Sequence, residues 1–219
     1  MSMATKREKR IASLRELGAL VREDLRYNGR ASWPGFQALA VHRFGVWKDG
    51  IEARPLRVPC TILYRIAYAF VRNFYGIELP LTTRIGRRLF VGHQHGIIVH
   101  HNAVIGDDCL IRQGVSIGQE RQMPGVPWWE VPGPKLGNRV EVGAGAVVIG
   151  NVTVGDGVRI GPNAVVMTNV PAGAIVTAPL SRIMVPPKRK PKPALEAAPE
   201  PAAEPEASGA GEPAARRTA

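Results

Sequence analysis

The sequence predicts a parallel β-helix of hexapeptide repeats, preceded by a helical segment and followed by a disordered tail. Three observations predict this fold: a six-residue period of aliphatic residues in the middle of the chain, a glycine maximum over the same stretch, and a proline-rich C-terminal end. The chain has 219 residues and a net charge of +11. Its two cysteines, Cys60 and Cys109, are too few for a disulfide scaffold or a cysteine-rich zinc module.

Residues 1–76 are predicted to form the helical segment. Apolar residues recur at helical spacing over 11–21, over 36–47 and over about 60–75. Most of the net charge lies here, since residues 1–75 hold 14 Lys and Arg against 6 Asp and Glu. The last predicted helix places Arg65 and Arg72 on one face. Such a helix rests on an anionic membrane surface, or packs on its own domain or a second subunit, and the sequence leaves both open.

The N-terminus has no apolar stretch with a small-residue cleavage site, and arginines interrupt the most apolar stretch, 58–75. We therefore expect a cytoplasmic protein, with peripheral contact to the inner membrane face through the basic helices as a further expectation.

Residues 77–183 are predicted to form the β-helix. A six-residue period is neither helical nor that of a meandering strand pair, and it fits about five coils of three short strands each. Cys109 occupies a small-residue position of the repeat, so we expect it in the core. The repeated aliphatic positions are Ile85, Val91, Val99, Ile105, Ile111, Ile117, Leu136, Val142, Val148, Val154, Ile160 and Val166.

Two insertions interrupt the repeat. Two extra residues between Val91 and Val99 accompany His93 and His95, and thirteen extra residues precede Leu136. The longer insertion predicts a projecting loop that carries Trp128 and Trp129. Loops that leave a rigid solenoid are usually functional. The two tryptophans either stack on a sugar ring of the acceptor or pack against a neighbouring subunit.

The tail, residues 184–219, is rich in proline, alanine and glutamate and is predicted to be disordered. The repeat region carries only 9 Lys and Arg against 7 Asp and Glu over 76–182, with no basic stripe, so no nucleic-acid partner is expected. Four histidines lie within 93–101 without a nearby cysteine or acidic ligand, so no metal site is expected either.

The repeat region resembles the serine acetyltransferase group of hexapeptide acyltransferases, and most closely its branch found with exopolysaccharide and capsule biosynthesis. The matching segments are GIELPLTTRIGRRLFVGHQHGIIVHHNAVIGDDCLIRQGVSIG and PKLGNRVEVGAGAVVIGNVTVGDGVRIGPNAVV. The resemblance implies a left-handed β-helix, a homotrimer with sites between subunits, acetyl-CoA as the acetyl donor and no metal. It also implies that His93 is the general base and that Glu78, fifteen residues earlier, is its carboxylate partner. The implied CoA-binding positions are Gly143, Ala144, Arg159, Gly161 and Pro162.

Two departures from the serine enzymes concern the acceptor. Gly92 stands where those enzymes carry Asp before the catalytic His, and their Arg-His pair falls here on Pro132 and Gly133. Because the missing side chains hold the amino acid in that family, we expect a saccharide hydroxyl or another small alcohol as acceptor, with His95 in its pocket. Serine O-acetylation in cysteine biosynthesis and an inactive hexapeptide scaffold are the alternatives.

Overall fold

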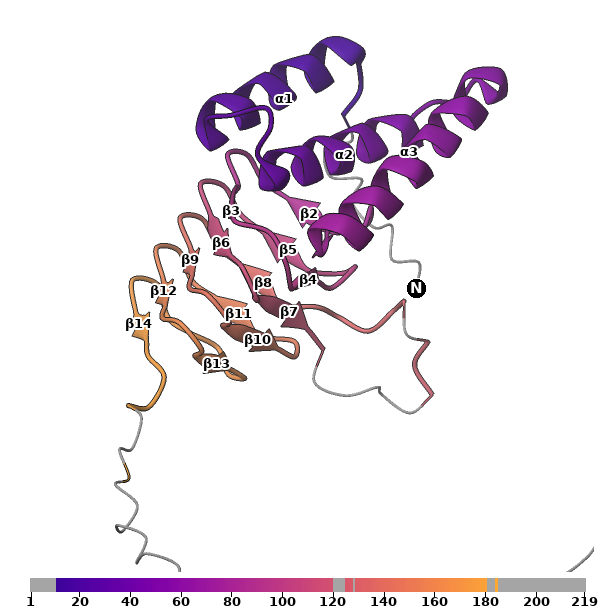
Figure 1. The fold of residues 1–219 in the computed structure, drawn as a ribbon. Helices are drawn as coiled ribbons and strands as arrows, with labels where there is room; N and C mark the ends of the chain where they lie inside the picture. The colour runs from indigo at the N-terminus through magenta and orange to yellow at the C-terminus, as the bar shows by residue number, and fades with distance from the viewer. Residues whose placement is uncertain (1–10, 120–124, 128, 181–183, 185–219) are drawn as a thin grey trace, which may run out of the picture. The chain divides into compact units, whose positions relative to one another are not determined.

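The computed structural model describes residues 11–119, 125–127, 129–180 and 184. Within these residues, three helices precede a stack of short strands (Figure 1). The helices are α1 (Leu14–Asn28), α2 (Pro34–Asp49) and α3 (Arg54–Tyr75). The strands are β1 (Ile77–Glu78), β2 (Arg84–Ile85), β3 (Phe90–Gly92), β4 (Ile97–Val99), β5 (Val104–Ile105), β6 (Leu110–Arg112), β7 (Ser116–Gly118), β8 (Lys135–Leu136), β9 (Glu141–Val142), β10 (Val147–Ile149), β11 (Thr153–Val154), β12 (Arg159–Ile160), β13 (Val165–Val166) and β14 (Ile175–Val176).

The strands form three parallel sheets. Each of the first four coils contributes one strand to each sheet, and the last coil contributes β13, β14 and, beside β11, only the isolated bridge of Val170 to Val154. Sheet A has the order β1-β4-β7-β10-β13, sheet B has β2-β5-β8-β11, and sheet C has β3-β6-β9-β12-β14. The register pairs equivalent repeat positions, so that Val91 lies beside Ile111, and Ile111 lies beside Val142. The predicted parallel β-helix is confirmed. The expected tail lies outside the described residues, apart from Met184.

The inward aliphatic side chains form the core of the solenoid. Val91, Ile111 and Val142 are at most 1% exposed, and burial of each such side chain stabilises the fold by about 1.5–3 kcal/mol. Cys109 is fully buried among them, and burial raises the pKa of its thiol to about 11. The predicted core role of this cysteine is confirmed.

The glycines that follow the aliphatic residues allow successive coils to approach at the corner between sheets B and C. A Cβ on Gly106 would lie 2.6 Å from the carbonyl carbon of Gly137. Polar side chains at the next position then join the coils. The Asp107 carboxylate accepts from the Arg87 amide at 2.7 Å, and the Asn138 side chain accepts from the Asp107 amide at 2.9 Å.

The helix α3 begins at Arg54, six residues before the predicted start. Pro55 lies in the first turn, where a missing N–H costs no hydrogen bond, so the helix extends back through this proline-containing stretch. The helix ends at Tyr75 and is capped by Gly76, whose φ of +61° is the left-handed conformation that glycine adopts without strain. No described helix is long and apolar enough to cross a bilayer.

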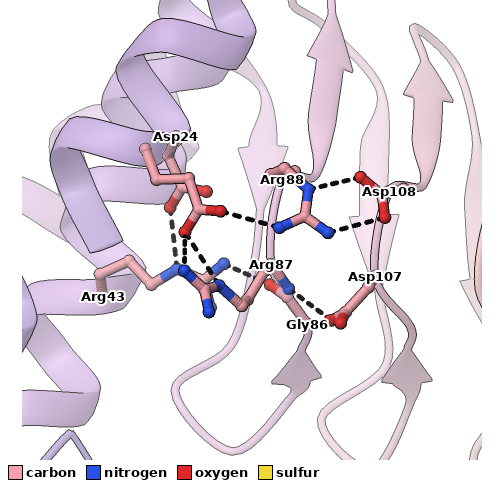
Figure 2. A network of polar contacts seen from close by, with 8 residues as sticks. Asp24, Arg43, Gly86, Arg87, Arg88, Asp107 and Asp108 are labelled. Carbon is pink, nitrogen blue, oxygen red and sulfur yellow. Dashed lines mark hydrogen bonds and ion pairs between the residues drawn. The ribbon is translucent and has the colours of Figure 1, made fainter. Parts of the chain in front are cut away.

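A buried ion pair joins the helices to the first coil of the solenoid (Figure 2). Arg43 of α2 donates from Nε to Asp24 of α1 at 3.0 Å, and the two side chains are 5% and 1% exposed. The same guanidinium donates to the carbonyl oxygens of Ile85 at 2.7 Å and of Gly86. Arg43 therefore holds α1, α2 and the end of β2 together.

A second, more exposed set of ion pairs lies beside it (Figure 2). Glu23 of α1 accepts from Arg87 at 2.6 Å and from Arg88 at 2.8 Å. Arg88 also pairs with Asp108 of the next coil, and this hydrogen bond lowers the pKa of the Asp108 carboxyl. Two arginines of one coil thus contact both the helices and the following coil.

Replacement of Arg43 by methionine is expected to lower the free energy of unfolding by about 3–5 kcal/mol, because it leaves the Asp24 carboxylate buried without its cation. Urea unfolding at a fixed protein concentration measures this change. Arg26→Met, on the exposed surface of α1, serves as control and is expected to change stability by less than about 0.5 kcal/mol. A decrease of less than about 1 kcal/mol in the free energy of unfolding of Arg43→Met would contradict the role of Arg43 in joining the helices to the solenoid.

The buried His42 side chain is expected to make the stability of the fold depend on pH. Its Nε2 lies 3.1 Å from the Thr83 carbonyl oxygen, and burial together with Arg43 lowers its pKa to about 3. Between pH 6.5 and 3 the unfolded chain takes up a proton that the folded chain does not, so stability falls as the pH falls. At pH 4.5 this group is expected to cost about 2–3 kcal/mol relative to pH 7. His42→Leu should flatten the profile by that amount, and an unchanged profile would refute the assignment.

Candidate active site

Most of the predicted site residues lie along one edge of the solenoid. We define the C–A corner as the turns that follow β3, β6, β9 and β12 and lead into sheet A. Left-handed residues stack along it from coil to coil, with φ of +73° at Gly96, +73° at Gly114, +69° at Gly145 and +57° at Asn163. A Cβ on Gly96 would lie 3.2 Å from the Gly114 Cα, and one on Gly114 would lie 3.3 Å from the Gly145 Cα. Because glycine has no side chain, the backbone along this edge is accessible from outside the solenoid.

The two-residue insertion interrupts this edge in the first coil. His93 and His95 are both exposed and have φ of +66° and +75°. A non-glycine residue in this conformation costs about 1–2 kcal/mol, and such strain concentrates at functional sites. The insertion therefore presents two imidazole rings above an edge that is lined mainly by glycine, with Asn163 in the last of its turns.

Backbone hydrogen bonds fix the histidine turn on both sides. The His95 amide donates to the Tyr75 carbonyl oxygen at 2.7 Å, and its own carbonyl accepts from Gly114 at 3.0 Å. The Tyr75 hydroxyl donates to the Gln37 side chain at 2.6 Å, which ties the end of α3 to α2. A Cβ on Gly76 would lie only 3.0 Å from the His95 Cα. The contacts at the end of α3 thus fix the position of the histidine turn.

The start of α2 adds an aromatic ring that sequence reasoning missed. The Trp33 indole lies 6.0 Å, centroid to centroid, from the His93 imidazole. Gly35 packs against the backbone of Val91 so closely that a Cβ there would overlap it. The close approach of Gly35 to β3 is what brings Trp33 over the histidine turn.

Glu78 lies in sheet A, on the far side of the corner from His93. Its neighbours Ile77 and Leu79 are 0% and 2% exposed, so the Glu78 side chain points outward. It lies near Tyr68 of α3, whose pKa is raised to about 12 by burial and by the Glu78 charge. Within residues 11–119 of one chain, no hydrogen bond or ion pair joins Glu78 to His93, so their pairing stays a prediction.

The predicted CoA-binding residues gather on neighbouring coils of the same edge. A Cβ on Gly143 would lie 2.7 Å from the Pro162 nitrogen and 2.8 Å from the Gly161 carbonyl carbon, which shows how closely these turns stack. Arg159 of β12 is 67% exposed and lies 3.8 Å from Glu141 of β9. Strands of a sheet are about 4.8 Å apart, so these turns lie roughly 10–15 Å from the histidine turn.

The long insertion leaves the solenoid at a different corner. It connects β7 of sheet A to β8 of sheet B, whereas His93 lies between sheets C and A. The Asn102 side chain donates to the carbonyl oxygens of Trp129 and Val131, both at 2.8 Å. Trp129 is 57% exposed, and Trp128 lies outside the described residues. The acceptor role of both tryptophans therefore stays a prediction.

The same A–B corner holds the other two histidines. The His100 and His101 rings lie 4.0 Å apart, and burial together with His101 lowers the pKa of His100. Gly133 packs here, since a Cβ on it would lie 2.8 Å from His100 Nδ1 and from the Ala103 nitrogen. Among the described residues no three side chains of the kinds that bind metals come together.

Comparison with known proteins identifies the family. The model of the bacterial transferase hexapeptide family, six repeats, matches residues 133–167. WcaB of Escherichia coli, named for an acetyltransferase role in colanic acid biosynthesis, is 34% identical over 167 residues, covering 74% of this chain and 98% of that protein. The serine acetyltransferase of Synechococcus elongatus is 36% identical over 124 residues, which cover 57% of this chain and 46% of the relative. The chain thus spans about half the length of that relative.

Solved structures agree on the fold. Soybean serine acetyltransferase superimposes with a TM-score of 0.60 at 26% identity, over 77% of this chain and 69% of that one. A Brucella abortus serine acetyltransferase in complex with coenzyme A has a TM-score of 0.63 at 24% identity, over 78% and 68%. The fold and the stacked corner define a hexapeptide-repeat transferase. The chain belongs to the acetyltransferase family of this class that contains WcaB and the serine acetyltransferases.

Gly76 provides a test of the histidine turn. Gly76→Ala is expected to lower stability by about 1–2 kcal/mol, because alanine is strained at φ +61° and its Cβ would press on the His95 backbone. Urea unfolding measures the loss. Gly18→Ala is the matched control: Gly18 lies inside α1 with open space around it, so alanine should stabilise by about 0.5–1 kcal/mol. Equal effects of the two substitutions would contradict this picture.

Proposed function

We propose that the protein transfers the acetyl group of acetyl-CoA to a hydroxyl of a saccharide acceptor, and that it acts as a homotrimer. The observation that carries the proposal is the match to WcaB over 98% of that protein's length, together with the strained histidine turn above the glycine-lined corner. The serine acetyltransferase relatives match over a smaller part of their length.

The proposed chemistry uses His93 as general base. Neutral imidazole takes the proton of the acceptor hydroxyl while the hydroxyl oxygen forms a bond to the thioester carbonyl carbon. The carbon–sulfur bond then breaks, and the imidazolium returns the proton to the CoA thiolate, so that the ring ends neutral. Such a base contributes on the order of 10²–10⁴ to the rate. The amide of Gly92 or of Gly96 stabilises the negative charge on the carbonyl oxygen.

Glu78 is proposed as the partner of the His93 ring. A carboxylate on the far ring nitrogen fixes the tautomer and stabilises the imidazolium. Its outward position next to the same corner supports this role, because both side chains emerge on the outer surface of the first coil.

The later coils are proposed to hold the donor. The low turns at Gly143, Ala144, Gly161 and Pro162 leave room for an extended pantetheine arm, and exposed Arg159 supplies a permanent cation for the CoA phosphates. The Brucella abortus structure, in complex with coenzyme A, supports a CoA donor for this fold.

The A–B corner favours a saccharide over serine as acceptor. By the resemblance, Gly133 stands where the serine acetyltransferases carry a side chain that holds the amino acid. The close packing around Gly133 leaves no space for such a side chain here. Aromatic rings are available instead, with Trp33 beside His93 and Trp129 exposed on the long insertion, and such rings stack on sugar faces. His95, which lies in the same turn as His93, is proposed to line the acceptor pocket. Serine O-acetylation is the second candidate, supported by the relatives that carry that name.

The experiment measures release of the CoA thiol from acetyl-CoA with a panel of sugars, nucleotide sugars and L-serine. We expect turnover with a saccharide, and a loss of kcat of about 10²–10⁴ in His93→Ala. Glu78→Gln should lower kcat more than it changes KM. Arg26→Met, on α1 and away from the corner, is the activity control. Thiol release with serine alone would establish the second candidate, and full activity of His93→Ala would overturn the mechanism. No release with any acceptor would support an inactive scaffold.

A further inference from the structure

The helix α3 carries a large exposed apolar surface. Large apolar residues are normally buried, and a contiguous apolar face on a folded chain marks a surface that something covers. The seven side chains concerned have exposed fractions of 45–69% along a single 22-residue helix. They are Leu56, Val58, Ile62, Leu63, Ile66, Phe70 and Phe74.

The opposite face of α3 explains why this surface stays uncovered within one chain. Tyr64 and Val71 are 8% and 4% exposed and pack toward α2, and Lys48 of α2 lies over the Tyr64 ring at 5.3 Å. Figure 1 shows α3 on the outer side of α2, at the end of the solenoid where the strands begin. The inward face is thus used by the fold, and the outward face remains for a partner.

Arginines follow one border of this apolar face. At 3.6 residues per turn, the spacings of 11 and 7 residues place Arg54, Arg65 and Arg72 within about 20° of one another around the helix. All three are exposed. The helix Arg54–Tyr75 contains no aspartate or glutamate. The border therefore has an uncompensated positive charge along nearly the full helix, which is about 33 Å long.

We propose that this face of α3 binds the surface of an anionic phospholipid bilayer. An interfacial helix places its apolar side chains at the boundary of headgroups and acyl chains, and its basic residues on the lipid phosphates. Arginine stems extend along apolar surface while the guanidinium groups reach the headgroups, which suits a row at the border of the face. The helix lies in the membrane plane.

Charge favours a bilayer over a second copy of this chain as occupant. A contact between two α3 faces would bring arginines of both copies together with no carboxylate on either helix to neutralise them. An anionic lipid surface neutralises all three at once. The N-terminal third as a whole also has an excess of positive charge, with 14 Lys and Arg against 6 Asp and Glu over residues 1–75.

Co-sedimentation of the full chain with large unilamellar vesicles tests the proposal. The vesicles are phosphatidylcholine alone or phosphatidylcholine with about one third phosphatidylglycerol. The wild type should bind the anionic vesicles only, with weaker binding at higher salt. Arg65→Ser with Arg72→Ser should weaken binding about 30-fold, since each arginine near such a surface contributes about a factor of five. Ile62→Ser with Ile66→Ser, which changes no charge, should weaken it about tenfold or more.

The matched control is Arg22→Ser with Arg26→Ser, which removes the same charge from exposed positions of α1 and should leave binding within about twofold. All substituted side chains are exposed, and thermal unfolding checks that each variant folds. Equal loss in the α1 and α3 arginine variants would overturn the proposal in favour of general charge attraction. Absence of wild-type binding would also overturn it. If the isoleucine variant instead lowers the oligomeric state in sedimentation velocity, the face is an interface between copies.

Discussion

The stacking of identical positions in successive coils is the constraint on which the rest of this structure depends. Val91, Ile111, Val142 and Ile160 follow one another in sheet C with backbone hydrogen bonds between every pair of neighbours. A residue added within a strand would turn the inward side chains of that strand outward. Insertions are therefore tolerated only at corners, and both insertions in this chain occur at corners. Of the candidate site residues, His93, His95 and Gly143 accordingly lie at a corner, whereas Glu78 and Arg159 lie in strands.

The helices depend on the solenoid through a small number of polar contacts. Arg43 crosses from α2 to carbonyl oxygens at the first B–C corner, and Asn28 of α1 donates to the Leu89 carbonyl oxygen at 3.0 Å. These contacts place the start of α2, and with it Trp33, next to the histidine turn. The helical segment is thus part of the candidate site and also carries the apolar face of α3.

The period of the sequence was sufficient to predict the solenoid, because each coil repeats the same local requirement. It was also sufficient to locate the insertion that holds His93 and His95, whereas the catalytic role predicted for His93 came from the resemblance to the serine acetyltransferases. The contact between Trp33 and His93 was not predictable in this way. It depends on Gly35 packing against Val91 over 56 positions of sequence, and nothing local to Trp33 indicates it. The start of α3 was predicted too late because it was placed from apolar spacing, whereas the helix begins at Arg54, and Pro55 lies in its first turn, where a missing N–H costs no hydrogen bond.

The distribution of the candidate residues over two corners bears on the proposed trimer. His93 lies at the C–A corner, while Trp129 and Gly133 lie at the A–B corner, across the full width of sheet A. An acceptor held against His93 of one chain cannot also reach the A–B corner of that chain without crossing the outer face of sheet A. That face exposes Ile98 and Val165, 52% and 59% exposed, which suit contact with another subunit. A trimer that packs sheet A against a neighbour would bring the two kinds of corner together from different chains, so an acceptor site that uses both His93 and Trp129 requires the proposed assembly.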